Sequence, residues 1–557
     1  MDQRLRYLFL FFLIGFLAVI IKLFYWQIIE NKRLSDLAIK QYYTSKEIPA
    51  ERGKIYTQDN FPLVMNKENH LLYANPQELK IPPEQLVTIL KTILPELKPP
   101  SQLSDRKLMW VPLVKNLDSS TKKSIEDLKI AGLGFESMDK RYYPEASMAA
   151  HLLGFVGEDS EGKEKGYFGL EGYYDNELKG KAGIKYYEKD ALGRPIPLSE
   201  QLEEKPIEGR NLFLNLDREV QFAIEYRLKK GLEKYGASSG LVIVMNPKNG
   251  AILGMASFPS YDPEKYYLFD QELYRNPAIS FDFEPGSIFK VLVMAAGIDS
   301  GRIKPDEVCG RCEGPRKIGE YTIKTWNDKY FPGSTMTDIL VHSDNVGMVY
   351  VVEKLGKERF YDYLDRFGFG RKTGIDLQGE ISPKLRDKED WREIDLATAS
   401  FGQGIAATPI QILAAVSAIA NGGNLYQPQV VKSIVEEKKT ITLKPVKVGK
   451  PISETTVKII TQMMVEAVEK GEAKWAKPKG YVIAGKTGTA QIPIAGHYDP
   501  EKTIASFIGF APANDPKFAM LVTLREPKTS PWGSETAAPL WFEIAKDIFR
   551  LWKIKAG

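Results

Sequence analysis

The chain has 557 residues, of which 43% are hydrophobic and 27% are charged. This length exceeds one ordinary domain, and this balance is typical of globular protein with a hydrophobic core. The 76 basic and 72 acidic residues nearly cancel, which does not indicate a nucleic-acid partner. Four histidines and two cysteines exclude a multi-histidine metal site and an all-cysteine zinc cluster. We therefore expect chemistry without a metal or cofactor, carried by Ser, Lys, Asp, Glu, Tyr or backbone groups.

The first segment of the chain predicts a membrane anchor. Residues 7–29 form a largely apolar stretch with a single charge at Lys22, and a helix of this length can cross a bilayer core of roughly 30 Å. Arg4 and Arg6 before it favour a cytoplasmic N-terminus. A cleavable signal peptide is the alternative, but no small-x-small cleavage site follows the apolar run. We expect a cytoplasmic stub over residues 1–6, one transmembrane helix over residues 7–29, and the rest of the chain outside the cytoplasm.

Two further domains are expected. Residues 30–211 alternate short apolar stretches with proline and glycine, which is typical of an α+β domain, and a helix over residues 119–129 follows a Ser-Ser-Thr capping cluster. From residue 212 onward, helices stand between a first and a last group of strands, which predicts an α/β domain with an antiparallel sheet over residues 212–557. Its expected elements are a helix at 218–232, a hairpin at 240–256, strands at 480–491, 503–511 and 518–524, and a final helix at 538–552.

Three short motifs carry the candidate chemistry, and the first is Ser287-Ile288-Phe289-Lys290. Pro-Gly before it and an apolar run after it predict a helix start, so Lys290 shares a helical face with Ser287. A serine hydroxyl becomes a nucleophile when a neighbouring base takes its proton, and a desolvated lysine can be that base. The helix N-terminus adds a positive field where an oxyanion would form. The same spacing also occurs by chance on solvated helices.

The second motif is Ser343-Asp344-Asn345. The serine can relay a proton between Lys290 and a leaving or attacking amine, and the asparagine can hold a substrate amide together with the lysine. A polar loop or a helix cap is the alternative interpretation of this tripeptide.

The third motif, Lys486-Thr487-Gly488-Thr489, ends an alternating segment that predicts a strand. The pleat places Lys486 and Gly488 on one face, so a peptide can approach the backbone there with its carboxylate near Lys486 and the threonine hydroxyls. The backbone N–H groups of Thr489 and Ser287 are candidate oxyanion donors. An edge strand protected by a lysine is the alternative. The order and contexts of all three motifs together are improbable by chance.

Cys309 and Cys312 form a separate Cys-Gly-Arg-Cys pair. A redox-active pair is one interpretation, but no βαβ pattern of thioredoxin type surrounds it. We favour a small structural disulfide or two unreactive thiols, and the sequence leaves these two alternatives open.

With its three motifs, the sequence resembles the class B penicillin-binding proteins, and the likeness covers nearly the whole chain. Three further boxes resemble the non-catalytic pedestal of that family: Arg52-Gly53-Lys54-Ile55, Arg141-Tyr142-Tyr143-Pro144 and Gly169-Leu170-Glu171-Gly172-Tyr173-Tyr174-Asp175. The resemblance implies an elongated pedestal over residues 30–211 and a transpeptidase domain over residues 212–557, with a five-stranded antiparallel sheet sandwiched by helices. It also implies that Arg52, Gly169 and Glu171 help to build the pedestal and its junction.

The resemblance implies a serine D,D-transpeptidase that attacks the penultimate D-Ala of a peptidoglycan stem pentapeptide, releases the terminal D-Ala and passes the acyl group to an amine of a neighbouring strand. β-Lactams would acylate the same serine. The implied location is the bacterial cytoplasmic membrane, with the bulk of the chain in the periplasm or extracytoplasmic space. The implied partner is a polytopic glycan polymerase of the shape, elongation, division and sporulation family. The implied site residues are Ser287, Lys290, Ser343, Asn345 and Lys486 for catalysis and Thr487, Gly488 and Thr489 for substrate binding.

The segment Ser400-Phe401-Gly402-Gln403-Gly404, followed by Thr408-Pro409, is closer to division-type members of the family than to elongation-type ones. We therefore expect septal wall synthesis, with lateral wall synthesis as the alternative. A membrane-bound β-lactamase or D,D-carboxypeptidase shares the acyl-enzyme step, but no Glu-x-x-x-Asn lies between the second and third motifs. A β-lactam sensor would need a cytoplasmic signalling domain, which the stub before Tyr7 does not provide. An inactive scaffold is disfavoured by the intact motifs.

Overall fold

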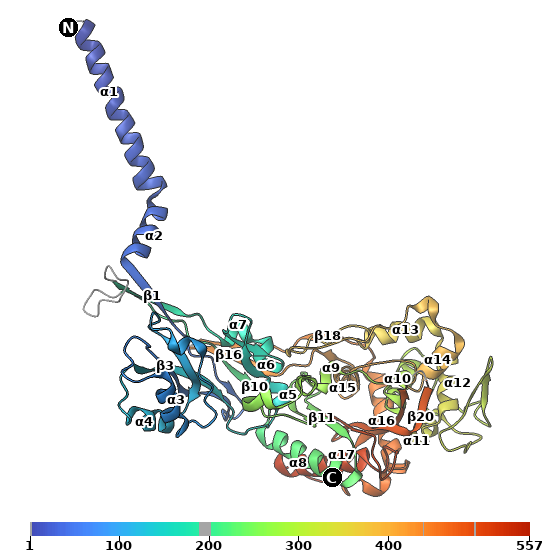
Figure 1. The fold of residues 1–557 in the computed structure, drawn as a ribbon. Coiled ribbons are helices and arrows are strands. Elements are labelled where there is room, and N and C mark those ends of the chain that lie inside the picture. The colour runs from blue at the N-terminus through green and yellow to red at the C-terminus, as the bar shows by residue number, and fades with distance from the viewer. Residues whose placement is uncertain (1–2, 189–201, 438, 495–496, 557) are drawn as a thin grey trace. The chain divides into compact units, whose positions relative to one another are not determined.

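The computed structural model describes residues 3–188, 202–437, 439–494 and 497–556. The chain forms two compact units (Figure 1). One unit is made of Met1–Arg52 and Lys179–Gly209, and the other is made of Gly53–Leu178 and Arg210–Gly557. The chain therefore begins in the smaller unit and passes into the larger one at Gly53. It returns to the smaller unit at Lys179 and enters the larger one again at Arg210.

The smaller unit carries the predicted anchor. α1 (Gln3–Phe24) continues into a π-helical turn (Tyr25–Ile29), and α2 (Asn31–Tyr42) follows. Among the described residues, Gln3–Ile29 is the one helical stretch that is long and apolar enough to cross a membrane. It includes the span predicted at residues 7–29. A three-stranded antiparallel sheet belongs to the same unit and consists of β1 (Tyr43–Ile48), β8 (Gly183–Glu188) and β9 (Leu202–Glu204).

A seven-stranded mixed sheet forms one part of the larger unit. Its order is β17-β16-β10-β2-β3-β4, with β5 paired to β3, and the pair of β10 and β2 is parallel. β10, β16 and β17 come from residue 211 onward, so the predicted pedestal segment and the predicted catalytic segment share one sheet. The strands are β2 (Ile55–Tyr56), β3 (Pro62–Ala74), β4 (Val111–Leu117), β5 (Leu133–Tyr142), β10 (Asn211–Leu214), β16 (Val431–Glu436) and β17 (Lys439–Thr442).

Helices α3 (Pro83–Lys91) and α4 (Ser119–Glu126) share a small core with β3 and β4. α4 is the helix predicted at residues 119–129, but Asp118 caps it instead of the Ser-Ser-Thr cluster. The Asp118 carboxylate accepts a hydrogen bond from the Thr121 N–H at 2.7 Å. A charged carboxylate is a stronger acceptor at a helix N-terminus than a hydroxyl, which explains the difference.

The three pedestal boxes meet around the buried side chain of Arg141. Its Nε donates to Glu171 Oε1 at 2.7 Å, and its Nη2 donates to the carbonyl oxygen of Gly53 at 2.6 Å. Its Nη1 donates to Asn66 Oδ1 at 2.7 Å. Because a planar guanidinium directs its donors at fixed angles, this one side chain aligns three segments that are distant in the sequence.

The third box also contacts the part of the larger unit that follows residue 211. The carbonyl oxygen of Gly169 accepts a hydrogen bond from the Gln378 N–H at 3.1 Å. The Tyr174 hydroxyl donates to Asp376 Oδ2 at 3.0 Å, and the Asp376 carboxylate also accepts from the backbone of β16 and the residue before it. Gly169 therefore lies at a junction, as the resemblance implied.

A five-stranded antiparallel sheet, in the order β12-β11-β21-β20-β19, forms the other part of the larger unit. The predicted hairpin is β11 and β12, in which Ile243 lies opposite Met255. β19 is an edge strand whose partner is β20. The predicted five-stranded antiparallel sheet is therefore confirmed. Its strands are β11 (Ser239–Met245), β12 (Ile252–Phe258), β19 (Ala484–Ile494), β20 (His497–Ala511) and β21 (Phe518–Arg525).

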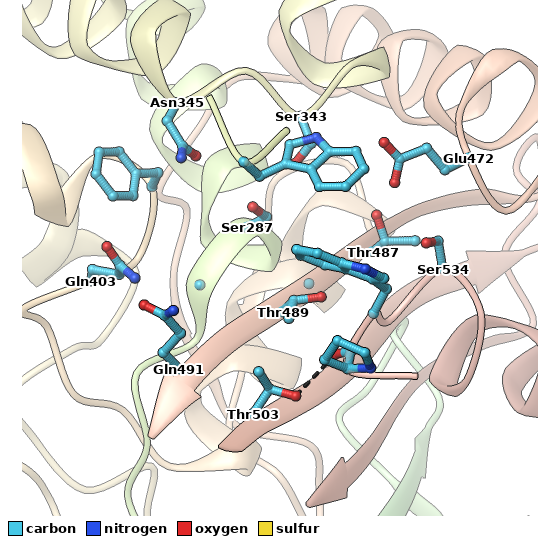
Figure 2. A pocket seen from close by; sticks show the side chains of 16 residues that line it. Ser287, Ser343, Asn345, Gln403, Glu472, Thr487, Thr489, Gln491, Thr503 and Ser534 are labelled. Atoms are coloured by element: carbon cyan, nitrogen blue, oxygen red, sulfur yellow. Dashed lines mark hydrogen bonds between the residues drawn. The ribbon is translucent and has the colours of Figure 1, made fainter. Parts of the chain in front are cut away.

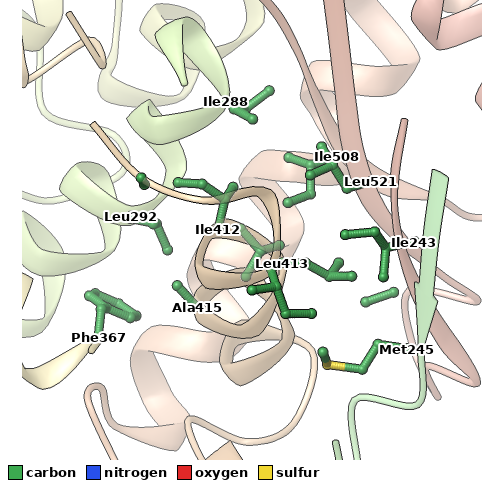
Figure 3. Packing of buried hydrophobic residues seen from close by; sticks show 14 of the residues in the cluster. Ile243, Met245, Ile288, Leu292, Phe367, Ile412, Leu413, Ala415, Ile508 and Leu521 are labelled. Atoms are coloured by element: carbon green, nitrogen blue, oxygen red, sulfur yellow. The ribbon is translucent and has the colours of Figure 1, made fainter. Parts of the chain in front are cut away.

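Helices cover both faces of this sheet. α8 (Arg218–Tyr235) and α17 (Ala537–Leu551) share one core with Val242 and Val244 of β11. On the other face, α15 (Pro409–Ile419) packs against Ile243, Met245 and Leu521 (Figure 3). Alternate residues of β11 therefore enter opposite apolar layers, which explains why this strand is a continuous hydrophobic run.

Four further helices contribute to the same core as α15: α10 (Lys290–Asp299), α11 (Met336–Val341), α12 (Asn345–Leu355) and α16 (Glu454–Lys470). Smaller elements connect these layers. They are α5 (Ala150–Leu153), β6 (Phe155–Glu158), β7 (Glu164–Tyr167), α6 (Gly169–Tyr173), α7 (Asp175–Leu178), α9 (Pro277–Ser280), β13 (Arg316–Ile318), β14 (Tyr321–Ile323), α13 (Lys357–Arg366), α14 (Glu393–Ala399), β15 (Leu425–Tyr426) and β18 (Lys447–Gly449).

Replacing Arg141 with methionine should destabilise the larger unit. The buried carboxylate of Glu171 would lose this cation, and breaking a buried ion pair from one side costs about 3 kcal/mol. We expect a lower midpoint of chemical denaturation, followed by tryptophan fluorescence. Lys115→Met is the control, since the ion pair of Lys115 with Glu158 is exposed and should contribute little. Equal midpoints for the two variants would show that Arg141 does not hold the boxes together.

Candidate active site

Residues from all three motifs line one cavity of about 290 Å³ (Figure 2). The first motif contributes Ser287, the second contributes Ser343 and Asn345, and the third contributes Thr487, Gly488 and Thr489. Lys290 and Lys486 lie behind this lining, with exposed fractions of 0% and 3%. The other lining residues are Gly286, Trp326, Phe401, Gln403, Glu472, Gln491, Thr503, Pro531, Trp532 and Ser534.

Ser287 lies on a tight turn that leads into α10. Gly286–Phe289 is a 3₁₀ turn and α10 begins at Lys290, so the predicted helix start is present with a tighter first turn. The Gly286 N–H donates to the carbonyl oxygen of Gly402 at 3.0 Å. Gly402 has a φ of +81°, and a Cβ there would lie 2.2 Å from the oxygen of Gly286. Only glycine permits this approach, so the segment that contains Gly402 supports the Ser287 turn.

The amine of Lys290 joins the first two motifs. Its Nζ donates to the carbonyl oxygen of Ser343 at 2.6 Å, and it lies 3.3 Å from Ser343 Oγ. It also donates to Asn345 Oδ1 at 2.8 Å. The Asn345 Nδ2 donates to the carbonyl oxygen of Lys324 at 3.1 Å, which orients the amide with its oxygen toward Lys290.

The second motif is both a helix cap and a wall of the cavity. Asp344 caps α12, because its Oδ1 accepts hydrogen bonds from the N–H groups of Val346 at 2.8 Å and Gly347 at 3.2 Å. Ser343 before it has a φ of +56°, in the left-handed region that few residues other than glycine adopt. This conformation lets the carbonyl oxygen and the hydroxyl of Ser343 both approach Lys290. The cap interpretation therefore describes Asp344, whereas Ser343 and Asn345 face the site.

Lys486 of β19 is buried even though β19 is an edge strand. Its Nζ donates to the carbonyl oxygen of Thr487 at 3.2 Å and lies 3.3 Å from Thr487 Oγ1. A lysine that protects an edge strand projects into solvent, so that interpretation does not apply. A Cβ on Gly488 would lie 2.8 Å from Ile288 Cγ2. The glycine therefore lets β19 pack directly against the Ser287 turn.

Burial changes the protonation of both lysines. It lowers the pKa of Lys290 well below the ordinary value, and the charge of Lys486 lowers it further, against opposing effects of Asp344 and Glu472. Burial also lowers the pKa of Lys486 to about 8, and Glu472 opposes this shift. Of the two amines, Lys290 is therefore the one whose neutral, proton-accepting form is favoured by its surroundings, whereas Lys486, with a pKa of about 8, keeps its charge at neutral pH.

Several lining residues belong to no motif, and sequence analysis missed them. Trp326 and Trp532 form an edge-to-face pair with ring centroids 4.8 Å apart, and the Trp326 indole N–H donates to the carbonyl oxygen of His342 at 3.3 Å. Phe401 and Gln403 belong to the Ser400–Gly404 segment, whose sequence indicated a division-type member but gave no sign that these two side chains line a cavity. The sequence feature that could have indicated Trp326 and Trp532 is their position in polar loops that contain glycine or proline, because aromatic residues in such loops often bind ligands.

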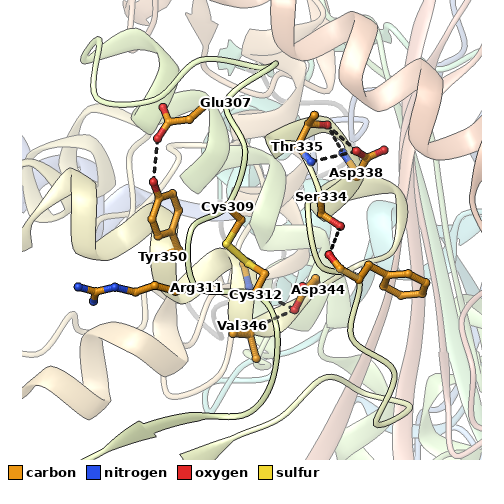
Figure 4. The surroundings of a disulfide bond; sticks show 12 residues. Glu307, Cys309, Arg311, Cys312, Ser334, Thr335, Asp338, Asp344, Val346 and Tyr350 are labelled. Atoms are coloured by element: carbon orange, nitrogen blue, oxygen red, sulfur yellow. Dashed lines mark hydrogen bonds between the residues drawn. A yellow bond between two sulfur atoms is a disulfide. The ribbon is translucent and has the colours of Figure 1, made fainter.

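Cys309 and Cys312 are joined by a disulfide in the connection between α10 and α11 (Figure 4). Both cysteines are buried, and the Cys309 N–H donates to the carbonyl oxygen of Ser334 at 2.9 Å. Figure 4 places the bridge beside Asp344 and Val346 at the start of α12. Of the two alternatives left open by the sequence, the structure has the disulfide.

Two family descriptions match the chain. "Penicillin binding protein transpeptidase domain" matches residues 240–550, and "Penicillin-binding Protein dimerisation domain" matches residues 47–214. Stage V sporulation protein D of Bacillus subtilis is 35% identical over 98% of this chain and 85% of its own length. Peptidoglycan D,D-transpeptidase FtsI of Escherichia coli is 29% identical over 95% of this chain and 87% of its own length.

Solved structures also resemble the chain. A peptidoglycan synthetase from Bifidobacterium adolescentis has a TM-score of 0.75 at 26% identity and covers 92% of this chain, with 98% of its own length aligned. Penicillin binding protein 3 from Mycobacterium tuberculosis, solved in complex with aztreonam, has a TM-score of 0.71 at 26% identity, with 92% and 98% covered.

Binding of a small carboxylate in the cavity should weaken as the pH rises above about 8, because the ammonium of Lys486 is then lost. Above that pKa we expect the dissociation constant to rise about tenfold per pH unit, since one proton is linked to binding. The measurement is an NMR titration with acetyl-D-alanine on both sides of this pH. Lys486→Met should bind weakly at every pH tested. The same pH dependence in that variant would assign the titration to another group.

Proposed function

This chain belongs to the class B penicillin-binding proteins, the peptidoglycan D,D-transpeptidases, and we propose that it works through an acyl-enzyme on Ser287. The observation that carries the proposal is the buried amine of Lys290, held by Ser343 and Asn345 behind the cavity that Ser287 lines. A neutral lysine in that position has the lone pair that a serine nucleophile requires.

In the first step, Ser287 Oγ attacks the carbonyl carbon of the penultimate D-Ala of a stem pentapeptide. The Oγ–C bond forms, and the C–N bond to the terminal D-Ala breaks. The proton of the hydroxyl passes to Lys290 and then, through the hydroxyl of Ser343, to the leaving nitrogen. The distance of 3.3 Å between Lys290 Nζ and Ser343 Oγ supports this route. β-Lactams enter the same step, and their opened ring stays attached to Ser287.

The third motif is the proposed binding site for the donor peptide. The free edge of β19 can pair with an extended peptide, and Gly488 keeps the backbone accessible in the cavity. The ammonium of Lys486 and the hydroxyls of Thr487 and Thr489 suit the terminal carboxylate. The N–H groups of Ser287 and Thr489 are the proposed oxyanion donors.

The location and the partner follow from the same proposal. Residues 1–6 form a cytoplasmic stub, residues 7–29 the single transmembrane anchor, residues 30–211 the pedestal and residues 212–557 the transpeptidase domain in the extracytoplasmic space. The apolar stretch Gln3–Ile29 and the two family matches support these limits. The proposed partner is a polytopic glycan polymerase of the shape, elongation, division and sporulation family, which would supply nascent strands beside the anchor.

Fluorescent penicillin should label the protein at Ser287, and mass mapping should locate the adduct there. Ser287→Ala should abolish labelling, and Lys290→Met should slow it by at least about 1,000-fold, because a triad-type base contributes that much. Ser300→Ala, at the end of the same helix, should leave labelling unchanged. Slow release of the adduct is expected, whereas rapid turnover would favour the β-lactamase alternative. An adduct on another residue would refute the site.

We further propose a division role, supported by the likeness of the segment that contains Phe401 and Gln403 to division-type members. Depletion of the protein in its host should give filamentous cells, because septal cross-linking would fail while the lateral wall continues to grow. Microscopy with a fluorescent D-amino acid would locate the loss of cross-linking at mid-cell. Rounded cells would favour the elongation-type alternative.

A further inference from the structure

Glu472 brings a negative charge into the cavity that the acylation step does not use. It follows α16 and precedes a short 3₁₀ turn (Lys474–Ala476), and its side chain is exposed. Among the described residues that line the cavity, Glu472 is the only one with a charged side chain. Figure 2 shows it beside Ser343, Thr487 and Ser534, on the side of the cavity away from Gln403.

This carboxylate does not assist binding of the donor peptide. The terminal carboxylate of the donor is proposed to lie near Lys486 and Thr487, and Glu472 on the same side would repel it. Partial burial raises the pKa of Glu472 above its ordinary value, and the charge of Lys486 and a hydrogen bond from Ser534 oppose this shift. A group that opposes the first half-reaction can still contribute to the second, in which the charge of the incoming substrate is different.

The second half-reaction brings a cation to the same side of the cavity. The leaving D-Ala departs from the side where its carboxylate was bound, and an attacking amine must approach the acyl carbon along that same path in reverse. The acceptor amine of a neighbouring stem peptide is an ammonium ion at neutral pH. Along this path it meets Glu472, Ser343 and Ser534.

We propose that Glu472 binds the ammonium group of the acceptor strand and so favours transfer to an amine over transfer to water. This inference rests on the proposed acyl-enzyme at Ser287. The ammonium loses one proton to the Glu472 carboxylate and from there to solvent. The free amine then attacks the acyl carbon, the new C–N bond forms, and the C–O bond to Ser287 breaks. The second amine proton returns to Ser287 Oγ through Ser343 and Lys290.

The test uses the full chain in detergent and a thioester donor peptide whose own amine is blocked. Acceptors are a stem tetrapeptide with a free side-chain amine and hydroxylamine, which is uncharged at neutral pH. For Glu472→Gln we expect the ratio of peptide transfer to hydrolysis to fall about tenfold, because one charge contact in a partly solvated cleft is lost. Transfer to hydroxylamine should be unchanged, and the loss should appear as a higher KM for the peptide acceptor.

Two controls separate this inference from the proposed function. Glu469→Gln removes one negative charge from the last turn of α16, just before Glu472, but lies outside the cavity lining, so its transfer ratio should match that of the unmodified protein. Fluorescent penicillin should still label Glu472→Gln at Ser287.

Normal labelling with an unchanged transfer ratio would overturn the acceptor role and leave the acyl-enzyme intact. A parallel loss with both acceptors would also overturn it, because the residue would then act on the reaction without recognising the cation. Failure of the unmodified protein to form an adduct would overturn the proposed function itself.

Discussion

The burial of the Lys290 amine is the constraint on which the rest of the site depends. An ammonium ion loses its hydration in this position, so the neutral amine is favoured and can act as a base. The amine still needs hydrogen-bond acceptors, and the carbonyl of Ser343 and the amide of Asn345 supply them. These contacts tie the start of α10 to the loop before α12. The enclosure that favours the free amine of Lys290 is therefore built partly by the second motif, whose carbonyl and amide oxygens hold that amine in place.

Close backbone packing holds the other two sides of the cavity. Gly488 lets β19 lie against the Ser287 turn, and Gly402 lets the segment before α15 reach the oxygen of Gly286. A methyl group at either position would meet an atom well inside van der Waals distance. The apolar layer of α15 against β11 and β21 packs the sheet that carries β19 into the same core as the helix that follows Ser287.

Three ionisable groups with different surroundings share this small volume. Lys290 is wholly enclosed, and its pKa is lowered well below the ordinary value. Lys486 is enclosed too, but its pKa of about 8 leaves it a cation at neutral pH, and Glu472 is an exposed acidic side chain. A reaction that binds an anionic donor, moves protons through a neutral base and then admits a cationic acceptor needs groups of each kind. These three groups can lie close together because the burial of each one has a larger effect on its charge than the distances between them.

The sequence by itself determined the features that depend on neighbours along the chain. Apolar length predicted the anchor, two apolar runs on either side of a turn predicted the hairpin of β11 and β12, and Pro-Gly before Ser287 predicted the start of a helix. Tertiary structure alone decided that β16 and β17 complete the pedestal sheet, that Arg141 aligns the three boxes and that Cys309 and Cys312 are bonded. It also brought Trp326, Trp532 and Glu472 to the cavity and lowered the pKa of Lys290 by burial. These features depend on contacts between distant segments and on the removal of water from particular groups, and neither is encoded in local periodicity or spacing.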